Sequence, residues 1–363
     1  MTRLHDLAAA GTSPWLDNIR RSWLSSGKFR EWVDDGIVGV TSNPTIFQKA
    51  IADSEDYDDA IRAMAGTDPE EAFFELAIAD VQEASDQLRG VWSSTNHLDG
   101  YVSFELPPEM ANDTAASTRA APDFWRRIGR PNIFIKIPGT AEGVAAIEDS
   151  IAAGVNINIT LLFSLKNYEA IHWAFIRGLE RRVEQGEPID DVHSVASFFV
   201  SRVDTAVDAL LPDDSLLRGV IAIANAKLAY QRFLEITADE RWQALAERGA
   251  HVQRPLWAST GTKNPAYSDV LYVDELIGPD CVNTMPDPTI EAFMDHGVVE
   301  RTVDRDVDGA QRQLEQLGDA GIDLDDVTRQ LEIDGVKAFS ASFDSLLDTL
   351  RGRLDEMGAR GAA

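Results

Sequence analysis

Residues 133–138 read IFIKIP, a short run of β-branched and aromatic residues with one lysine in its middle. Because neighbouring side chains of a β-strand point to opposite faces, the three isoleucines share one face and Lys136 lies on the other. Residues 155–160 read VNINIT and repeat the pattern, with two asparagines and a threonine opposite the apolar side chains. An open parallel sheet covered on both faces is apolar throughout, whereas a barrel can carry polar side chains inside, near its mouth. The two segments therefore predict strands of a closed barrel.

Runs of this kind recur along the chain, and each is followed by a longer amphipathic stretch with its charges on one face. Such alternation of strands and helices is typical of a parallel sheet. The eight strands that we predict are Pro14–Ile19, Gly36–Asn43, Gly100–Leu106, Asn132–Pro138, Val155–Phe163, Val192–Val200, Val252–Ser259 and Cys281–Met285. Eight strands suit a closed (β/α)8 barrel of the TIM type, in the α/β class. No linker, low-complexity tract or repeat marks a boundary, so we expect residues 1–363 to form a single domain.

Helical segments are expected between and after these strands. Asp68–Arg89 opens with DPEE, which places a proline and two acidic residues in the first helical turn, as the helix dipole favours. The tail also has helical periodicity, strongest over Gln311–Leu317 and Val336–Leu350. We expect these extra C-terminal helices, within residues 305–363, to cover the barrel.

The chain is strongly acidic, with 61 Asp and Glu residues against 33 Lys and Arg and a formal net charge of -28. This charge repels polyanions at long range, so nucleic acids and anionic membranes are not expected as partners. A small anionic substrate would need a local group of lysine or arginine side chains and backbone N–H donors. The N-terminus lacks a basic start followed by an apolar core, and no run of about 18 apolar residues occurs. We therefore expect neither a targeting peptide nor a membrane segment.

The single cysteine, Cys281, excludes an intramolecular disulfide and a multi-cysteine zinc site, and it indicates a reducing, cytoplasmic location. The six histidines lack the spacing of metal ligands. A G-x-G-x-x-G turn and a G-x-S-x-G elbow are also absent from the sequence. We therefore expect no metal and no other cofactor, and small molecules as ligands. The sequence leaves open whether the protein is a monomer or a homodimer.

Lys136 is the central candidate for chemistry, because a lysine inside an apolar barrel must be neutralised, paired or used. Removal from water disfavours an ammonium ion, and the neutral amine is the form that attacks a ketone to give an imine. Glu105 and Asp17, each near the end of a strand, are candidate proton donors and acceptors. The alternative is structural, namely a buried ion pair of Lys136 with Glu105 or Asp17 that only stabilises the barrel. Residue type alone does not separate the two interpretations.

Polar residues at other strand ends are candidates for substrate binding. The Asn43 amide has the donor and the acceptor that hold hydroxyl groups, but a cap for the helix beginning at Pro44 is the alternative. For an anion, Arg202 offers a planar fork, and Lys263 lies in a loop rich in Gly, Ser and Thr. Both cations follow strands, so we expect both at the same end of the barrel.

Four segments, in this order along the chain, together resemble the transaldolase family. They are TSNPTIF at 41–47, FIKIPGT at 134–140, NINITLLF at 156–163 and ASFFVSR at 196–202. The resemblance covers nearly the whole chain and is greatest to the longer-chain bacterial branch of the family. It implies a barrel of the permuted class I aldolase type, which transfers a three-carbon unit between sugar phosphates in the non-oxidative pentose phosphate pathway.

The resemblance also implies roles for individual residues. Lys136 forms the Schiff base with the C2 carbonyl of fructose 6-phosphate or sedoheptulose 7-phosphate, and Asp17 takes the proton from the C4 hydroxyl. Glu105 and Thr160, through a water, serve the proton transfers of imine formation. The dihydroxyacetone unit then passes to erythrose 4-phosphate or glyceraldehyde 3-phosphate. The implied substrate-binding residues are Asn43, Asn158, Ser197, Phe199, Arg202, Ser259 and Lys263.

The chain departs from the best-known branch of the family in one loop. An arginine follows the seventh strand there, whereas ASTGTK at 258–263 brings Lys263, a point charge that cannot form a bidentate fork. We therefore expect Arg202 ahead of Lys263 and Ser259 as the phosphate ligand. Two alternatives keep the barrel: a fructose-6-phosphate aldolase that releases free dihydroxyacetone, and a non-catalytic barrel that binds sugar phosphates.

Overall fold

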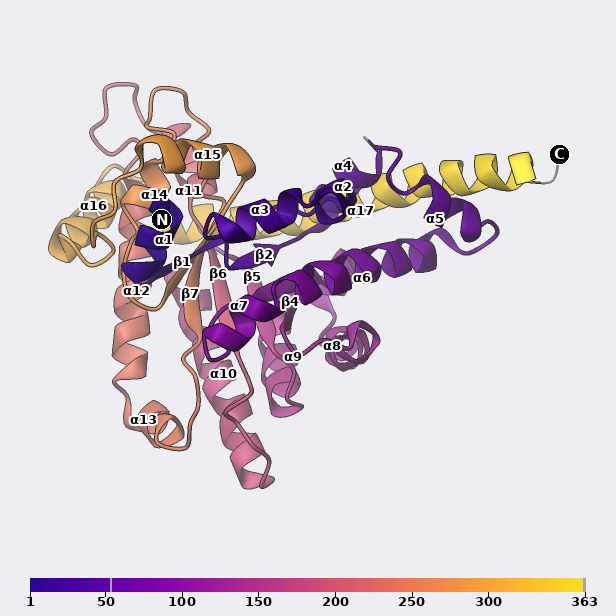
Figure 1. The fold of residues 1–363 in the computed structure, drawn as a ribbon. Coiled ribbons are helices and arrows are strands. Elements are labelled where there is room, and N and C mark those ends of the chain that lie inside the picture. Colours follow the sequence, from indigo (N-terminus) through magenta and orange to yellow (C-terminus); the bar gives the residue numbers. More distant parts are fainter. Residues whose placement is uncertain (53, 362–363) are drawn as a thin grey trace.

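The computed structural model describes residues 1–52 and 54–361. Eight parallel strands form a closed barrel in sequence order, with helices around it (Figure 1). The strands are β1 Thr12–Leu16, β2 Gly39–Thr41, β3 Tyr101–Glu105, β4 Ile133–Pro138, β5 Ile157–Leu162, β6 Ser194–Phe199, β7 Arg254–Ala258 and β8 Cys281–Met285. All of β1 pairs with β8, which closes the barrel. The (β/α)8 fold predicted from the polar strand faces is confirmed.

Each predicted strand overlaps an observed one, and all but the eighth are shorter than predicted. β1 ends at Leu16, so Asp17 lies in the loop that follows it. β2 ends at Thr41, which leaves Asn43 in the turn before the next helix. Gly36, predicted to begin the second strand, has a φ of +118° and lies in a turn, a conformation that glycine adopts without strain. The alternation of polar and apolar side chains continues beyond the residues that pair. The hydrogen bonds between strands define where each strand ends.

Helices join the strands and enclose the barrel. They are α1 Arg3–Ala9, α2 Arg21–Ser26, α3 Lys28–Asp34, α4 Pro44–Ala52, α5 Asp58–Ala63, α6 Pro69–Gln87, α7 Arg89–Ser94, α8 Thr114–Ile128, α9 Ala141–Ala152, α10 Leu165–Glu184, α11 Ser201–Asp208, α12 Ile221–Thr237, α13 Glu240–Ala246, α14 Leu271–Asp274, α15 Asp287–His296, α16 Val307–Asp319 and α17 Leu324–Gly361, with a short 3-10 helix η1 at Pro108–Asn112. The predicted helix Asp68–Arg89 is α6. The Asp68 side chain caps it by accepting from the amides of Glu70 (3.0 Å) and Glu71 (3.3 Å).

The N-terminal end of the barrel contains a buried ion pair. Arg254 Nη1 lies 3.1 Å from Asp99 Oδ1, and the two side chains are 6% and 9% exposed. Asp99 also accepts from the Ser13 hydroxyl (2.7 Å), and Arg254 donates to the Cys281 carbonyl (2.8 Å). These hydrogen bonds compensate for the loss of water around both charges. The pair connects β1, β7 and β8 with the loop before β3.

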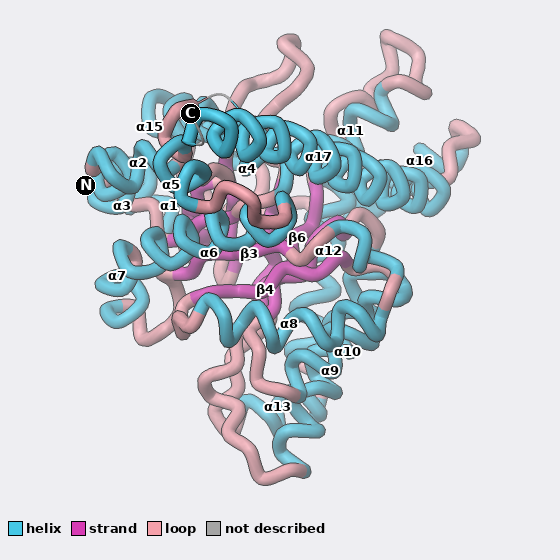
Figure 2. Tube along the Cα trace, turned by 90° about the vertical axis from the view of Figure 1, so that its right-hand side faces the viewer, coloured by secondary structure: helices cyan, strands magenta, loops and turns pink. Residues whose placement is uncertain are grey.

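The C-terminal tail forms α16 and α17, which contain the two segments predicted to be most periodic. α17 is a single helix of 38 residues that packs against α4, α5, α6, α11 and β5. Figure 2 shows it crossing above the barrel strands, from the side of α16 toward α4 and α5. Its buried side chains, among them Phe339, Phe343 and Leu346, join the main hydrophobic core. Packing across the barrel is what stabilises so long a helix.

Candidate active site

A cavity of about 290 Å³ lies among the C-terminal ends of the barrel strands, where active sites of such barrels are found. Eight of the eleven residues that the sequence pointed to line it, namely Asp17, Asn43, Lys136, Ser197, Phe199, Arg202, Ser259 and Lys263. Two of the others, Glu105 and Asn158, are hydrogen-bonded to residues of the cavity wall. The predicted residues therefore gather in one place, although they come from many parts of the chain.

Lys136 and Glu105 form a buried ion pair across β4 and β3. They are register partners, with Lys136 Nζ 3.0 Å from Glu105 Oε2 and side chains that are 5% and 4% exposed. The lysine also donates to the Ser42 carbonyl (3.2 Å). The ion pair expected as the structural alternative thus exists. It differs from Arg254–Asp99 because Lys136 borders the cavity, and because only two of its three N–H donors have partners among the described residues.

Burial changes the pKa of two carboxyl groups near the Lys136 amine, those of Glu105 and Asp17. It raises the pKa of Glu105, while the charge of Lys136 acts in the opposite direction. Burial likewise raises the pKa of Asp17, against the charge of Lys136 and a 2.7 Å hydrogen bond from the Thr41 hydroxyl. Both groups therefore bind a proton at higher pH than they would in water. Two such carboxyl groups beside one amine are suited to proton transfer in different steps.

Asn158 is held inside the barrel by serines from two other strands. Its Nδ2 donates to Ser103 Oγ of β3 (2.9 Å), and its Oδ1 accepts from Ser197 Oγ of β6 (2.7 Å). Its register partner in β4 is Lys136. The orientation of the amide is therefore set by its neighbours, and it lies next to the lysine on the inner face of the barrel.

Thr160 follows Asn158 on the same strand and is fully buried. Its Oγ1 has no hydrogen-bond partner within the part of the chain that the structure describes. The pairing of β5 with β6 shifts between Ile159 and Leu162, and Leu161 has a φ of +57°. Bulges re-aim side chains, and a bulky residue with positive φ marks a constrained backbone. A buried hydroxyl without a partner, next to an irregular strand end, makes Thr160 a candidate for a role in the site.

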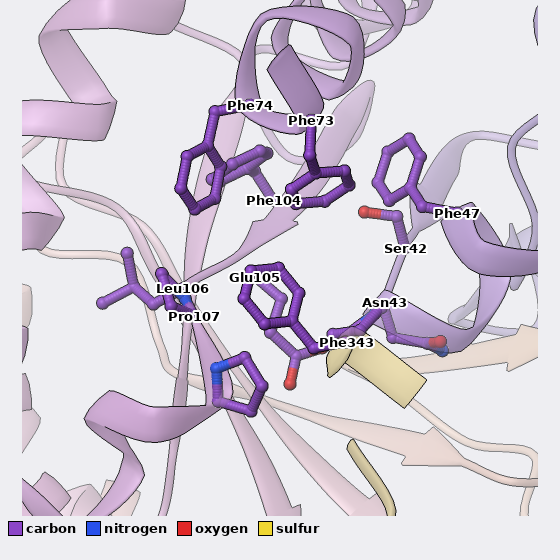
Figure 3. Close-up of a pocket in the computed structure, with 12 residues that line it drawn as sticks. Ser42, Asn43, Phe47, Phe73, Phe74, Phe104, Glu105, Leu106, Pro107 and Phe343 are labelled. Atoms are coloured by element: carbon purple, nitrogen blue, oxygen red, sulfur yellow. The ribbon is translucent and has the colours of Figure 1, made fainter. Parts of the chain in front are cut away.

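Asn43 fits both interpretations that the sequence left open. Its Oδ1 accepts from the Ile46 amide (3.0 Å), so it caps α4, and the cap alternative is confirmed. The same residue lines the main cavity and also a narrow space of about 10 Å³ beside Glu105. Figure 3 shows the residues that line that space, among them Asn43, Glu105 and Phe343. The cap holds the asparagine at the cavity wall.

Arg202 and Lys263 reach the cavity from two different elements. Arg202 is half-buried in α11, and its Cζ lies 5.2 Å from the ring centre of Phe199. Lys263 is exposed in the loop after β7. Ser259 of that loop has a φ of +55°, and its hydroxyl lies 3.0 Å from that of Ser201. The two cations give the mouth of the barrel local positive charge within an acidic chain, as anion binding requires.

Other contributors to the site were missed from the sequence. The Thr41 and Thr284 hydroxyls lie 2.6 Å apart and lead to Asp17. Lys49 of α4 adds a third cation to the cavity wall, and Phe339 of α17 adds an aromatic ring. Lys49 lies on α4, the helix that begins within the TSNP segment, so that segment indicated this part of the site. Phe339 had no such signal, because it lies on a separate helix far along the chain.

The cavity wall includes the buried Lys136 amine and the Asp17 carboxyl group, and Glu105 is paired with that amine. Within residues 1–52 and 54–361, no three His, Cys, Asp or Glu side chains gather closely enough to hold a metal ion. None of the helices described is both long and apolar enough to cross a membrane.

Comparison with known proteins shows the family of the chain. The family model for transaldolase/fructose-6-phosphate aldolase matches residues 14–350. A protein named transaldolase from Frankia alni is 46% identical, with 99% of both chains covered. A transaldolase 2 from a Nostoc species is 46% identical over 98% of both chains, and a transaldolase from Mycobacterium bovis is 45% identical over 96% of both. The expected resemblance and enzyme class, a transferase of the transaldolase type, are confirmed. The chain belongs to the transaldolase/fructose-6-phosphate aldolase family.

Proposed function

We propose that the protein transfers a dihydroxyacetone unit reversibly between sugar phosphates through a Schiff base on Lys136. The proposed donors are sedoheptulose 7-phosphate and fructose 6-phosphate, and the acceptors are erythrose 4-phosphate and glyceraldehyde 3-phosphate, as in the non-oxidative pentose phosphate pathway. The observation that carries the proposal is the buried Lys136 amine, which is 3.0 Å from Glu105 and borders the cavity. Lysine forms the imine directly, so no metal or organic cofactor enters the proposal.

Imine formation is assigned to Lys136, Glu105 and Thr160. The ammonium gives up a proton to Glu105, its hydrogen-bond partner, whose pKa burial raises, and the free amine then attacks C2 of the ketose. The carbinolamine loses water as Glu105 returns the proton. The Thr160 hydroxyl, which lacks a partner among the described residues, would hold the water that relays it.

Cleavage of the carbon–carbon bond is assigned to Asp17. It takes the proton of the C4 hydroxyl, the C3–C4 bond breaks, and its electron pair passes into the iminium group to give an enamine on Lys136. The aldose phosphate leaves, and an acceptor aldehyde reacts with C3 by the reverse steps. The hydrogen bond from Thr41 orients the Asp17 carboxylate, and burial raises its pKa toward that of a useful base.

Substrate binding is assigned to the polar and aromatic side chains of the same cavity. The groups proposed to hold the three-carbon unit are Asn43, Asn158, Ser197 and Phe199. Those proposed to hold the phosphate are Arg202, Ser259 and Lys263. Arg202 is supported most strongly, because it is half-buried beside an aromatic ring and presents several donors in one plane.

Trapping of the covalent intermediate tests this function. The protein is incubated with fructose 6-phosphate and reduced with borohydride, and the modified peptide is identified by mass spectrometry. A dihydroxyacetone-sized adduct on Lys136 is the expected result. A folded protein that gains no adduct would return Lys136 to the structural role of an ion-pair partner and reopen a non-catalytic, sugar-phosphate-binding role.

The pH dependence of the rate should report Asp17. The base must be ionised, so activity falls as the pH drops through its raised pKa, above the value of about 3.9 for a free aspartate. Asp17→Asn is expected to lose about 10²- to 10⁴-fold in rate, and its residual activity should lack this acidic limb. The measurement is the initial rate of transfer between pH 4 and 8. If Asp17→Asn keeps the same fall in rate at acidic pH, that fall reports the titration of another group, with Glu105 as the first candidate.

The same variant should change stability in a pH-dependent way. A carboxyl group whose pKa is raised by folding favours the native state below its unfolded pKa, and this contribution is lost as the pH rises through the folded pKa. Asp17→Asn should therefore raise Tm at pH 7 relative to the parent protein, with a smaller difference below pH 4. Loss of activity with a gain in stability separates a functional carboxyl group from a structural one.

A fructose-6-phosphate aldolase is the second candidate, because the family description names that activity too. It shares the imine but releases free dihydroxyacetone instead of passing it to an aldehyde. An assay with fructose 6-phosphate and no acceptor separates the two. Rapid, sustained release of dihydroxyacetone would favour the aldolase, whereas release that depends on erythrose 4-phosphate being present as acceptor would favour transfer.

The proposed location is the cytoplasm, and the proposed assembly is a monomer or a homodimer. Support for a reducing compartment comes from Cys281, the only cysteine of the chain, which is free and buried. Light scattering on the purified protein gives the number of subunits.

A further inference from the structure

The C-terminal helix α17 contributes to the wall of the proposed active site. Phe339 lines the cavity that contains Lys136, although α17 is not part of the barrel itself. One turn further along, Phe343 lines the narrow space beside Glu105. The two rings are 5% and 2% exposed, so both are enclosed by the protein. α17 therefore contributes apolar surface to the cavity that Lys136 lines and to the space beside Glu105.

Polar contacts hold α17 to helices that follow different strands. Glu332 accepts a hydrogen bond from Asn167 of α10 (2.5 Å), and Ser342 accepts one from Thr45 of α4 (2.8 Å). Further along, Arg353 pairs with Asp58 of α5. The contacts are spread from Glu332 to Arg353, over more than half of the helix. They hold the helix in one position across the mouth of the barrel.

The helix also lies very close to the irregular end of β5. A Cβ atom added to Gly335 would lie 2.9 Å from the Leu161 side chain, inside normal contact distance. Leu161 is the residue with positive φ that follows Thr160. Phe343 packs edge-on against Phe73 of α6, with ring centres 5.5 Å apart. Close packing at these points leaves little room for water between the helix and the barrel.

The proposed reaction is sensitive to water beside Lys136. After cleavage, Lys136 carries an enamine, which has two fates. It can attack an acceptor aldehyde through C3. Alternatively, a proton adds to C3 to give an iminium ion, water adds to C2, and the C2–Nζ bond breaks to leave dihydroxyacetone and the protonated amine. The second route consumes one water for each unit released, so its rate depends on how readily water reaches C2.

We propose that Phe339 is a specificity-determining residue that keeps water away from the imine carbon, so that the three-carbon unit passes to an aldehyde and is not released. Phe339 is the side chain that α17 contributes to this cavity. A buried phenyl ring offers no hydrogen bond, so water beside it is disfavoured. The inference rests on the proposed function, since it concerns the fate of the intermediate on Lys136.

Three variants test it. Phe339→Ala removes the ring, Phe339→Leu keeps an apolar side chain of intermediate size, and Leu346→Ala is the control. Leu346 is fully buried and lies two turns along the same helix, but it does not line the cavity. The measured quantity is the ratio of dihydroxyacetone released to unit transferred, at a fixed concentration of erythrose 4-phosphate.

Phe339→Ala should raise this ratio by about tenfold or more, and Phe339→Leu by less, because a smaller side chain admits more water. Leu346→Ala should lower Tm and leave the ratio unchanged. An unchanged ratio in folded Phe339→Ala, or an equal rise in Leu346→Ala, would overturn the proposal. If Phe339→Ala does not fold, Phe339→Leu decides in the same way.

Borohydride trapping separates this inference from the function on which it rests. Both Phe339 variants should still form the adduct on Lys136. If the parent protein forms no adduct, the proposed function itself has failed. If the parent and both variants form it with the same ratio of release to transfer, the function stands and the role of Phe339 is rejected.

Discussion

Lys136→Met should lose the transfer activity, by at least about 10³-fold in kcat/KM, because the other two amines of the cavity wall, Lys49 and Lys263, are exposed and are not buried beside Glu105 as Lys136 is. The borohydride-trapped adduct should disappear with it. Methionine keeps a similar length and removes the amine, so the cavity is not emptied. The measurements are the rate of transfer from fructose 6-phosphate to erythrose 4-phosphate and the mass of the intact protein after reduction.

The fold of this variant needs its own control, because Lys136 is half of a buried ion pair. Loss of one partner from such a pair typically costs about 3–5 kcal/mol. Glu105 can instead take up a proton, since burial already raises its pKa, so the expected loss is smaller. Arg254→Met, at the other end of the barrel, should lower stability and keep the adduct. Transfer or adduct formation retained in Lys136→Met would contradict the mechanism.

Arg202→Gln should lower kcat/KM for fructose 6-phosphate by about 10²- to 10³-fold, because a charge-assisted fork to the phosphate is replaced by a neutral amide. The effect on unphosphorylated fructose should be slight, since that donor has no phosphate to bind. The decisive measurement is the ratio of kcat/KM for the two donors, in the parent and in the variant. A ratio that falls toward one assigns Arg202 to the phosphate.

Lys263→Gln is the matched control for this prediction. Lys263 lines the same cavity but is exposed, so solvent screens its charge, and we expect a loss of about tenfold or less. The loss of kcat/KM in Arg202→Lys should lie between the losses in Arg202→Gln and Lys263→Gln, because lysine keeps the positive charge but lacks the planar fork of donors. Equal losses for phosphorylated and unphosphorylated donors in Arg202→Gln would instead show that Arg202 supports the shape of the pocket, through its contact with Phe199.

The location of the site was predictable from short segments. Period-two alternation is a local property of a strand, so it places Lys136 and Asn158 on the inner face without any knowledge of the other strands. Polar residues late in their strands then fall at the mouth of a barrel. The same alternation identified Glu105 as well. The predicted positions of Asp17 and Asn43 were less accurate, because both lie just beyond the strand ends and pairing between strands defines those ends.

The sequence by itself therefore determined the βα alternation, the inner and outer faces of the strands, and the end of the barrel where polar groups collect. Only the tertiary structure decided that Lys136 pairs with Glu105 and the Ser42 carbonyl, and that Phe339 lines the cavity. The physical reason is the separation along the sequence of the residues that interact. Alternation and capping depend on residues a few positions apart, whereas these contacts join segments that meet only after the barrel closes and α17 packs across it.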